Sequence, residues 1–317
     1  MSEAVHRRSF LSALAVTPLV PEFAPGLVPE LARGLVPAAA PGLTLGSVPR
    51  VARTPKIKLS CNLYSFNASL RGGEMTLEQV IDTCAELGFD AVDPTGYYFP
   101  GHPAPPADSY LYSVKRRAFR NGLDISGTGV RNDFTVPEAA KREADVAHVG
   151  RWVEVAAKLG APALRVFDGR GEAEGPTRQR RIDWVVEAFR DCATHGERHG
   201  VVIAYQNHDE LLKTADEVLA LRERVASDWF GLNVDVGSLR TGDPYEEIAR
   251  LAPFACTWQI KERLYRKGQE EKTDLRRVFA ILREAGYRGY APLETLGPGD
   301  PREKVRRFLD EARTALA

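Results

Sequence analysis

From Lys56 onward, the sequence alternates between short apolar runs and amphipathic stretches of helical length. Strands are predicted for residues 57–65, 89–93, 123–129, 162–168, 201–207, 230–235, 255–261 and 289–294. Helices are predicted for residues 76–87, 109–121, 137–159, 176–199, 213–226, 243–250, 272–285 and 301–315. Such alternation is typical of parallel α/β folds, because each parallel strand pair needs a long crossover connection. Eight units in about 260 residues predict one eight-stranded (β/α) barrel over residues 56–317.

Residues at the predicted helix ends support these boundaries. Thr76 precedes the first helix and Gly88 follows it, as expected for an N-cap and a C-terminal glycine. Asp274 and Asp300 stand at two later helix starts. The alternative is an open doubly wound sheet, which would place a glycine-rich phosphate turn after the first strand. The segment at 65–75, SFNASLRGGEM, lacks that glycine spacing, so we favour the closed TIM barrel.

Residues 1–55 differ in composition from the predicted barrel. The pair Arg7 and Arg8, followed by Ser-Phe-Leu and a modest apolar run, resembles a bacterial twin-arginine export signal. The run is short and Pro18 interrupts it, so stable membrane insertion is not expected. Residues 18–50 repeat Pro, Gly, Ala, Leu and Val, which is typical of a flexible linker. We expect a periplasmic or secreted protein; the alternative is a cytoplasmic one with a disordered extension or a misassigned start.

Charge and cysteine usage argue against two classes of protein. The chain has 43 basic and 43 acidic residues, whereas a nucleic-acid-binding protein usually carries a basic excess. Cys61, Cys84, Cys192 and Cys256 are widely spaced and form no CxxC pair, so no zinc ribbon or redox motif is indicated. We expect them to be small buried hydrophobic residues, although spacing alone leaves a disulfide open.

Polar residues stand at the ends of the last four predicted strands, namely Gln206, Asp235, Gln259 and Glu294. In a barrel, the C-terminal strand ends open onto one mouth, where the active site lies. Unpaired carboxylates facing the barrel axis would be costly to bury, so we expect a cation among them. Two carboxylates and two amide oxygens suit a divalent metal ion.

The same segments resemble the xylose-isomerase-like sugar phosphate isomerase/epimerase family of TIM barrels. The resemblance covers residues 56–317 and is strongest in YQNHDELLKTADEVLAL, GLNVDVGS, WQIKE and YRGYAPLETL. It implies one manganese, magnesium or cobalt ion, held by Glu, Asp, His and Glu at the positions of Gln206, Asp235, Gln259 and Glu294. Asp235 and Glu294 match this pattern, whereas Gln206 and Gln259 replace a glutamate and a histidine. An amide accepts no proton, so Gln206 cannot supply half of the family's acid/base pair.

The resemblance implies proton transfer next to a carbonyl, with Glu294 as general base and metal ligand. His208 and Lys261 are the candidates for the second proton carrier. His208 follows Gln206 by two positions, and histidine is the residue type most often used as a proton carrier at neutral pH; alternatively, it only orients a ligand or the loop. Lys261 shares a strand face with Gln259 and is placed to polarise a carbonyl; alternatively, it pairs with a carboxylate.

The ends of the first four predicted strands offer weaker candidates for substrate contacts. Asp93, Arg131 and Asp168 bring polar groups close to the predicted mouth. Tyr64 lies among aromatic residues that are suited to stacking on a sugar ring, although such clusters more often serve packing. We therefore predict that these four residues bind the substrate.

These features predict a metal-dependent isomerase or epimerase, or a related keto-sugar lyase, whose partner is a small-molecule carbohydrate. A second hypothesis is a non-catalytic carbohydrate-binding barrel that has lost part of the metal site. A third is an abasic-site endonuclease, which needs a cluster of zinc-binding histidines and carboxylates, whereas only His208 and His102 stand near the predicted mouth. Whether the chain forms a homo-oligomer is left open.

Overall fold

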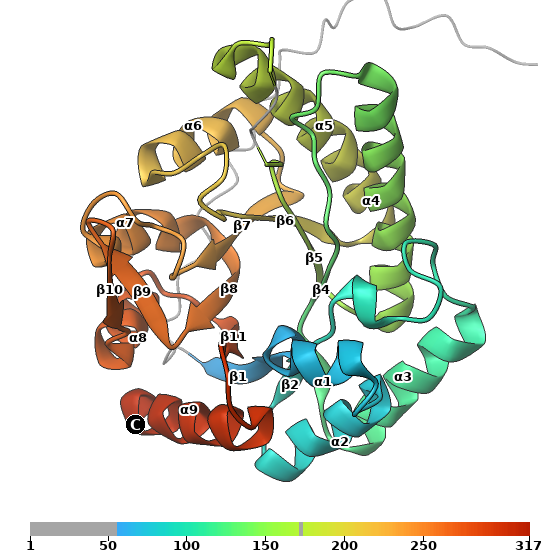
Figure 1. Ribbon diagram of the computed structural model, residues 1–317, viewed down its shortest axis with the longest axis vertical. Helices are drawn as coiled ribbons and strands as arrows, with labels where there is room; N and C mark the ends of the chain where they lie inside the picture. The colour runs from blue at the N-terminus through green and yellow to red at the C-terminus, as the bar shows by residue number, and fades with distance from the viewer. Residues whose placement is uncertain (1–55, 171–173) are drawn as a thin grey trace, which may run out of the picture. The chain divides into compact units, whose positions relative to one another are not determined.

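The computed structural model describes residues 56–170 and 174–317. The predicted export signal and linker, residues 1–55, lie outside these ranges. Figure 1 shows a ring of strands with helices arranged around it. The described part of the chain therefore has the architecture of a helix-wrapped barrel.

The barrel strands pair in parallel and close on themselves. They are β1 Ile57–Asn62, β2 Ala91–Asp93, β3 Asp124–Ile125, β4 Thr128–Gly129, β5 Ala163–Val166, β6 Val202–Gln206, β7 Phe230–Asp235, β8 Ala255–Lys261 and β11 Gly289–Glu294. The order is β3-β2-β1-β11-β8-β7-β6-β5-β4, so the first and last strands lie side by side. β3 and β4 are two halves of the third barrel strand, and a bridge from Thr95 to Gly129 links the β2 segment to β4. The predicted eight-stranded barrel is confirmed.

Each barrel strand is followed by a helix on the outside of the ring (Figure 1). The helices are α1 Asn67–Gly72, α2 Leu77–Leu87, α3 Asp108–Arg120, α4 Ala139–Leu159, α5 Arg178–His199, α6 Ala215–Val225, α7 Pro244–Leu251, α8 Leu275–Glu284 and α9 Pro301–Leu316. Short 3-10 turns cover η1 Leu63–Phe66, η2 Gly96–Tyr98 and η3 Ala252–Phe254. Within residues 56–170 and 174–317, we find no helix with the length and apolarity needed to cross a membrane.

Capping residues set the helix boundaries. The Thr76 hydroxyl accepts from the Gln79 N–H, and the Gln79 side chain accepts from the Thr76 N–H, forming a capping box at α2. Asp274 and Asp300 each accept a backbone N–H at the start of α8 and α9. Gly88 ends α2 at φ 85°, in the left-handed region that glycine adopts without steric penalty. These predicted helix ends are confirmed.

A hairpin that the sequence analysis missed follows β8. β9 Arg263–Arg266 and β10 Gln269–Lys272 pair antiparallel and occupy part of the segment predicted as the seventh connection. Lys267 and Gly268 form the two-residue loop, with φ of 49° and 78°. Positive φ at both loop positions matches the right-handed twist of a hairpin, so the Lys-Gly step was the available signal. The following helix begins at Leu275 rather than at the predicted residue 272.

The third barrel strand is interrupted, whereas one strand was predicted over residues 123–129. The Ser126 hydroxyl donates to the Val92 carbonyl at 3.2 Å, and the Thr128 hydroxyl donates to the Pro94 carbonyl at 2.7 Å. The Ser126 N–H also donates to the Val92 carbonyl, at 2.9 Å, so the Ser126 hydroxyl adds to the backbone pairing at this point. Gly127, which lies between the two halves, was the available signal for the break.

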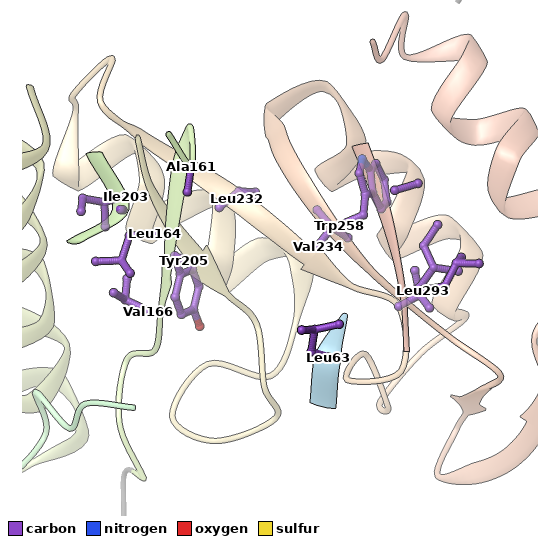
Figure 2. Packing of buried hydrophobic residues seen from close by; sticks show 14 of the residues in the cluster. Leu63, Ala161, Leu164, Val166, Ile203, Tyr205, Leu232, Val234, Trp258 and Leu293 are labelled. Carbon is purple, nitrogen blue, oxygen red and sulfur yellow. The ribbon is translucent and has the colours of Figure 1, made fainter. Parts of the chain in front are cut away.

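Alternate residues of each strand pack outward into the core between sheet and helices. Leu164 of β5 is paired with Ile203 of β6, and Val166 with Tyr205, and these side chains gather in Figure 2. Tyr205 packs against Phe189 of α5 with ring centroids 5.4 Å apart. The four cysteines are free, and three of them are fully buried, as expected for small hydrophobic residues. The other residues of each strand therefore point into the barrel.

Candidate functional site

A cavity of about 570 Å³ opens at the C-terminal ends of the barrel strands. Gln206 of β6, Gln259 and Lys261 of β8, and Glu294 of β11 line it. Asp235 ends β7 in contact with Gln206 and Lys261 and is completely buried. A larger groove of about 810 Å³ lies between α8 and α9, outside the barrel, and is lined mainly by exposed charged side chains. The strand-end cavity is the candidate site, because it alone of the two gathers buried ionisable groups.

Both oxygens of the Asp235 carboxylate are engaged. Oδ2 accepts from Gln206 Nε2 and Lys261 Nζ at 2.7 Å each, and from Ser238 Oγ at 2.9 Å. Oδ1 accepts from the Gly237 N–H at 2.9 Å. Burial alone would raise the pKa of Asp235, but Lys261 and the other donors hold it below its ordinary value. Asp235 is therefore held as a charged, fully hydrogen-bonded carboxylate.

Glu294 is engaged on one side only. Gln259 Nε2 donates to its Oε2 at 2.7 Å, and Lys261 Nζ lies 3.6 Å from the same oxygen. Among residues 56–170 and 174–317, no donor bonds to Oε1. Because Glu294 lines the cavity, it can accept a proton from a bound molecule at this oxygen.

The orientation of the Gln259 amide is fixed from both ends. Its Nε2 faces the Glu294 carboxylate, which can only accept. Its Oε1 lies 3.2 Å from Arg165 Nη1 and 3.2 Å from Asn62 Nδ2, which can only donate. The amide therefore joins a carboxylate to an arginine, and its oxygen points away from the ion pair of Lys261.

A buried ion pair that the sequence analysis missed forms the floor of the cavity. Arg165 of β5 donates to Asp93 Oδ2 at 2.8 Å and to Thr95 Oγ1 at 3.0 Å. Both side chains of the pair are almost buried, with 6% and 7% exposure. Asp93, predicted as a substrate contact, is instead the partner of this arginine. A charged residue between apolar neighbours in the strand sequence ALRV was the available signal for Arg165.

His208 and Arg131 lie together at another side of the cavity. His208 Nδ1 is 3.5 Å from Glu210 Oε1, and Arg131 forms an ion pair with the same carboxylate. The Arg131 guanidinium also stacks on Phe167, 4.5 Å from the ring centroid. Both predicted residues therefore face the cavity, with one shared acidic partner.

Tyr64 lies at the rim of the cavity, and its side chain is 37% exposed. It meets Tyr97 edge to face, with centroids 6.3 Å apart, and Arg71 lies 5.3 Å from the Tyr97 centroid. An exposed aromatic wall of this kind is available to a sugar ring. Tyr64 therefore lies where the predicted sugar contact requires it, and the contact itself stays a prediction.

Asp168 does not reach the cavity. It shares the outward face of Val166, where its Oδ2 accepts from the Tyr205 hydroxyl at 3.2 Å and from the Leu212 N–H at 3.1 Å. Burial raises the pKa of this carboxyl to about 7, and Glu210 adds to the rise. The expected substrate contact is therefore corrected: alternation along β5 turns Arg165 inward and Asp168 outward.

The raised pKa of Asp168 predicts a pH-dependent stability. Its folded-state pKa lies above its ordinary value of 3.8, so its stability contribution is fully present below about pH 4 and is lost as pH rises through about 7. We expect Asp168→Asn to flatten the decline in unfolding free energy between about pH 4 and about pH 7. Urea unfolding of both proteins measures this, with exposed Asp191→Asn as control. Equal slopes in wild type and variant would show that Asp168 is charged throughout.

A known protein family matches most of this barrel. The model of the xylose isomerase-like TIM barrel family matches residues 81–312, which is most of the described barrel. The chain belongs to the xylose isomerase-like TIM barrel family. Solved structures agree with this fold. D-psicose 3-epimerase from Clostridium cellulolyticum H10, crystallised with D-tagatose, is 15% identical, has a TM-score of 0.69, and the match covers 82% of this chain and 99% of that one.

Two further proteins similar to this xylose isomerase-like barrel have names that describe an activity on sugars. 3-keto-D-glucoside 4-epimerase from E. coli is 14% identical with a TM-score of 0.67, and the match covers 82% of this chain and 100% of that one. The C-glycoside deglycosidase alpha subunit of Microbacterium trichothecenolyticum is 27% identical over 187 residues, or 57% of this chain. The match spans about half of that protein's length, 47%.

The four residues expected to hold a divalent metal in this xylose isomerase-like barrel lie together, but their donor atoms do not fit one. Both Asp235 oxygens already accept hydrogen bonds, and the Lys261 ammonium lies between Asp235 and Glu294. The Gln206 amide turns its Nε2 to the Asp235 carboxylate, and the Gln259 oxygen faces Arg165. The expectation of a metal at this position is therefore not supported by the geometry, and we derive no step through a metal.

One other group of residues has ligand spacing for a metal ion. Glu154 of α4 and His195 and His199 of α5 place their ligand atoms within 4.8 Å of one another. The group lies on the helical surface, with Glu154 and His199 exposed, and contains none of the residues of the cavity. Exposed groups of this kind are common without any ion, so we assign it no role.

Proposed function

We propose that this protein is a sugar isomerase, epimerase or related keto-sugar lyase, which moves a proton on the carbon next to a carbonyl. The observation that carries the proposal is the one-sided engagement of Glu294. Its Oε2 is held by Gln259 and Lys261, while no described residue bonds to Oε1 in a polar cavity. A positioned carboxylate with one open oxygen is suited to general base catalysis.

The proposed reaction begins when Glu294 removes the proton. The C–H bond breaks, its electron pair moves onto the carbonyl oxygen, and an enolate forms. Protonation of the same carbon from the opposite face inverts it, and His208 is our candidate for this second proton carrier. For isomerisation, a proton moves from the hydroxyl on this carbon to the enolate oxygen, and the former carbonyl carbon is protonated. Departure of a substituent next to the enolate instead completes an elimination. No oxidant or reductant is consumed in any of these outcomes.

The cavity offers groups that suit a polyhydroxylated substrate. The Gln206 Oε1 atom is buried and has no hydrogen-bond partner in the described part of the chain, so it is free to accept from a hydroxyl. Arg131 and His208 supply further donors to the cavity, and Tyr64 supplies an aromatic face. The sugar-acting relatives support the substrate class, and the keto-glucoside epimerase and the deglycosidase favour a keto-sugar or a glycoside derived from one.

The test is a panel of keto-sugars and keto-glycosides incubated with the protein in deuterated water. We expect deuterium to enter at the carbon next to the carbonyl of at least one substrate, because an enolate takes its proton from solvent. Proton NMR measures the loss of that signal. Saturable binding of a sugar without exchange at any carbon would instead favour the non-catalytic carbohydrate-binding barrel.

We also propose that the chain is exported through its Arg7-Arg8 signal. Lysine keeps the charge but not the guanidinium, and twin-arginine recognition depends on the paired arginines. Replacing both arginines with lysine should therefore retain the protein in the cytoplasm of a bacterial host. Cell fractionation measures this, with Arg33→Lys in the linker as control. Export of the double variant at the wild-type level would rule out this signal.

A further inference from the structure

A single ammonium group lies close to two buried carboxylates at the site. Lys261 Nζ lies 2.7 Å from Asp235 Oδ2 and 3.6 Å from Glu294 Oε2. The side chains are 13%, 0% and 4% exposed, so water screens the three charges little. Two carboxylates at this depth need a nearby cation, and Lys261 supplies it from within the chain. Burial alone would lower the pKa of this ammonium, but Asp235 and Glu294 hold it above its ordinary value.

The two glutamines complete an arrangement built for this ammonium. Gln206 Nε2 and Gln259 Nε2 each donate at 2.7 Å to one of the carboxylates. Because a carboxylate only accepts, both amide oxygens point elsewhere, and neither can coordinate a cation between the acids without losing its hydrogen bond. Glutamine in place of glutamate at position 206 therefore removes one negative charge, and both glutamines supply donors to the carboxylates, as a monovalent internal cation requires.

The charge count leads to the same result. Asp235 and Glu294 contribute two negative charges and Lys261 one positive charge, so the cluster has a net charge of minus one. A divalent ion placed here would lie within a few ångströms of the ammonium and would be repelled by it. We infer that Lys261 is the resident cation of this site, and that its ammonium takes the place of the divalent metal that the family resemblance implies.

The catalytic part of this inference rests on the proposed function. When Glu294 removes the proton, negative charge develops on the carbonyl oxygen of the substrate. Lys261 lies beside Glu294 and lines the cavity, so its remaining N–H groups are available to that oxygen. A preorganised cation facing the developing charge stabilises the enolate, which is the contribution a Lewis acid would make. Deuterium exchange should then be insensitive to EDTA.

The first test uses no substrate. His199→Gln first disrupts the surface group formed by Glu154, His195 and His199, so that it cannot contribute bound metal. The metal content and thermal midpoint of this full-length variant are then measured. We expect no stoichiometric divalent metal, and no shift of the midpoint with EDTA or manganese chloride. One bound equivalent of metal, or a midpoint that EDTA lowers, would overturn the inference without any variant of the site itself.

The second test asks whether Lys261 is what excludes the metal. Gln206→Glu with Gln259→His restores the ligand types of the family, and manganese binding is measured by calorimetry with and without Lys261→Met. We expect the triple variant to bind manganese at least about a hundredfold more tightly than the double variant, because the ammonium repels the ion. The matched control replaces the exposed Lys141 instead of Lys261 and should behave as the double variant. Equal affinities in the double and triple variants would contradict the inference.

These readouts separate the two proposals. If no keto-sugar exchanges deuterium, the proposed function fails, while metal content and manganese affinity still report on Lys261. If exchange occurs and EDTA abolishes it, the proposed function stands and Lys261 is not the resident cation.

Discussion

Glu294→Gln should abolish deuterium exchange while leaving the fold intact. The amide has nearly the shape of the carboxylate and can still accept the hydrogen bond from Gln259 Nε2, but it takes no proton. We expect a loss of at least about a hundredfold in the exchange rate, the usual scale for removal of a general base. The rate is measured by proton NMR with the best substrate of the keto-sugar panel.

Glu284→Gln is the matched control, because Glu284 is exposed at the C-terminal end of α8, outside the cavity. It should retain the wild-type rate. Circular dichroism and the thermal midpoint of Glu294→Gln establish that the barrel is folded. An exchange rate within a few fold of wild type in folded Glu294→Gln would remove this residue from the role of base.

Arg165→Met should be the most destabilising of the single changes considered. The substitution keeps part of the aliphatic side chain but removes the guanidinium, which leaves Asp93 as a buried carboxylate without its ion-pair partner. Removing one partner of a buried pair costs roughly 3–5 kcal/mol of unfolding free energy. Chemical denaturation at neutral pH measures the loss, and the closed barrel should respond with one cooperative transition.

A double-mutant cycle identifies the cause of that loss. Asp93→Leu removes the stranded charge, so Arg165→Met combined with Asp93→Leu should cost less than the sum of the two single changes. The same double-mutant cycle on the exposed pair Lys58 and Asp124 provides the comparison. We expect a coupling energy of at most about 1 kcal/mol for that pair. Strict additivity at Arg165 and Asp93 would show that their ion pair contributes nothing to the fold.

Agreement between sequence and structure is best where only local information is needed. Apolar runs and helical periodicity place each of the eight units, because the alternation of side chains along a strand is a property of the backbone. Capping residues such as Thr76 and Asp300 act on the next turn of the same helix, so their role is visible in a few consecutive letters. The Lys267-Gly268 hairpin was equally local, and it was missed because its strands are short and charged.

Asp168 and Arg165 show where prediction from the local sequence fails. Both belong to the same strand segment, and the sequence analysis chose the acid at its end rather than the arginine within it. Which of the two alternating faces points inward depends on the register of β5 against β4 and β6. Once that register is set, Arg165 meets Asp93 inside the barrel, and Asp168 meets Tyr205 outside it.

The sequence by itself determined the eight-unit barrel and the four strand-end positions Gln206, Asp235, Gln259 and Glu294. It left Lys261 with two roles, as a group that polarises a carbonyl or as the partner of a carboxylate. Only the tertiary structure placed its ammonium between Asp235 and Glu294 and turned both amides toward those acids. The reason is that the contacts join residues up to 35 positions apart on four neighbouring strands. Their distances are set by the closure of the barrel, which no stretch of the sequence contains.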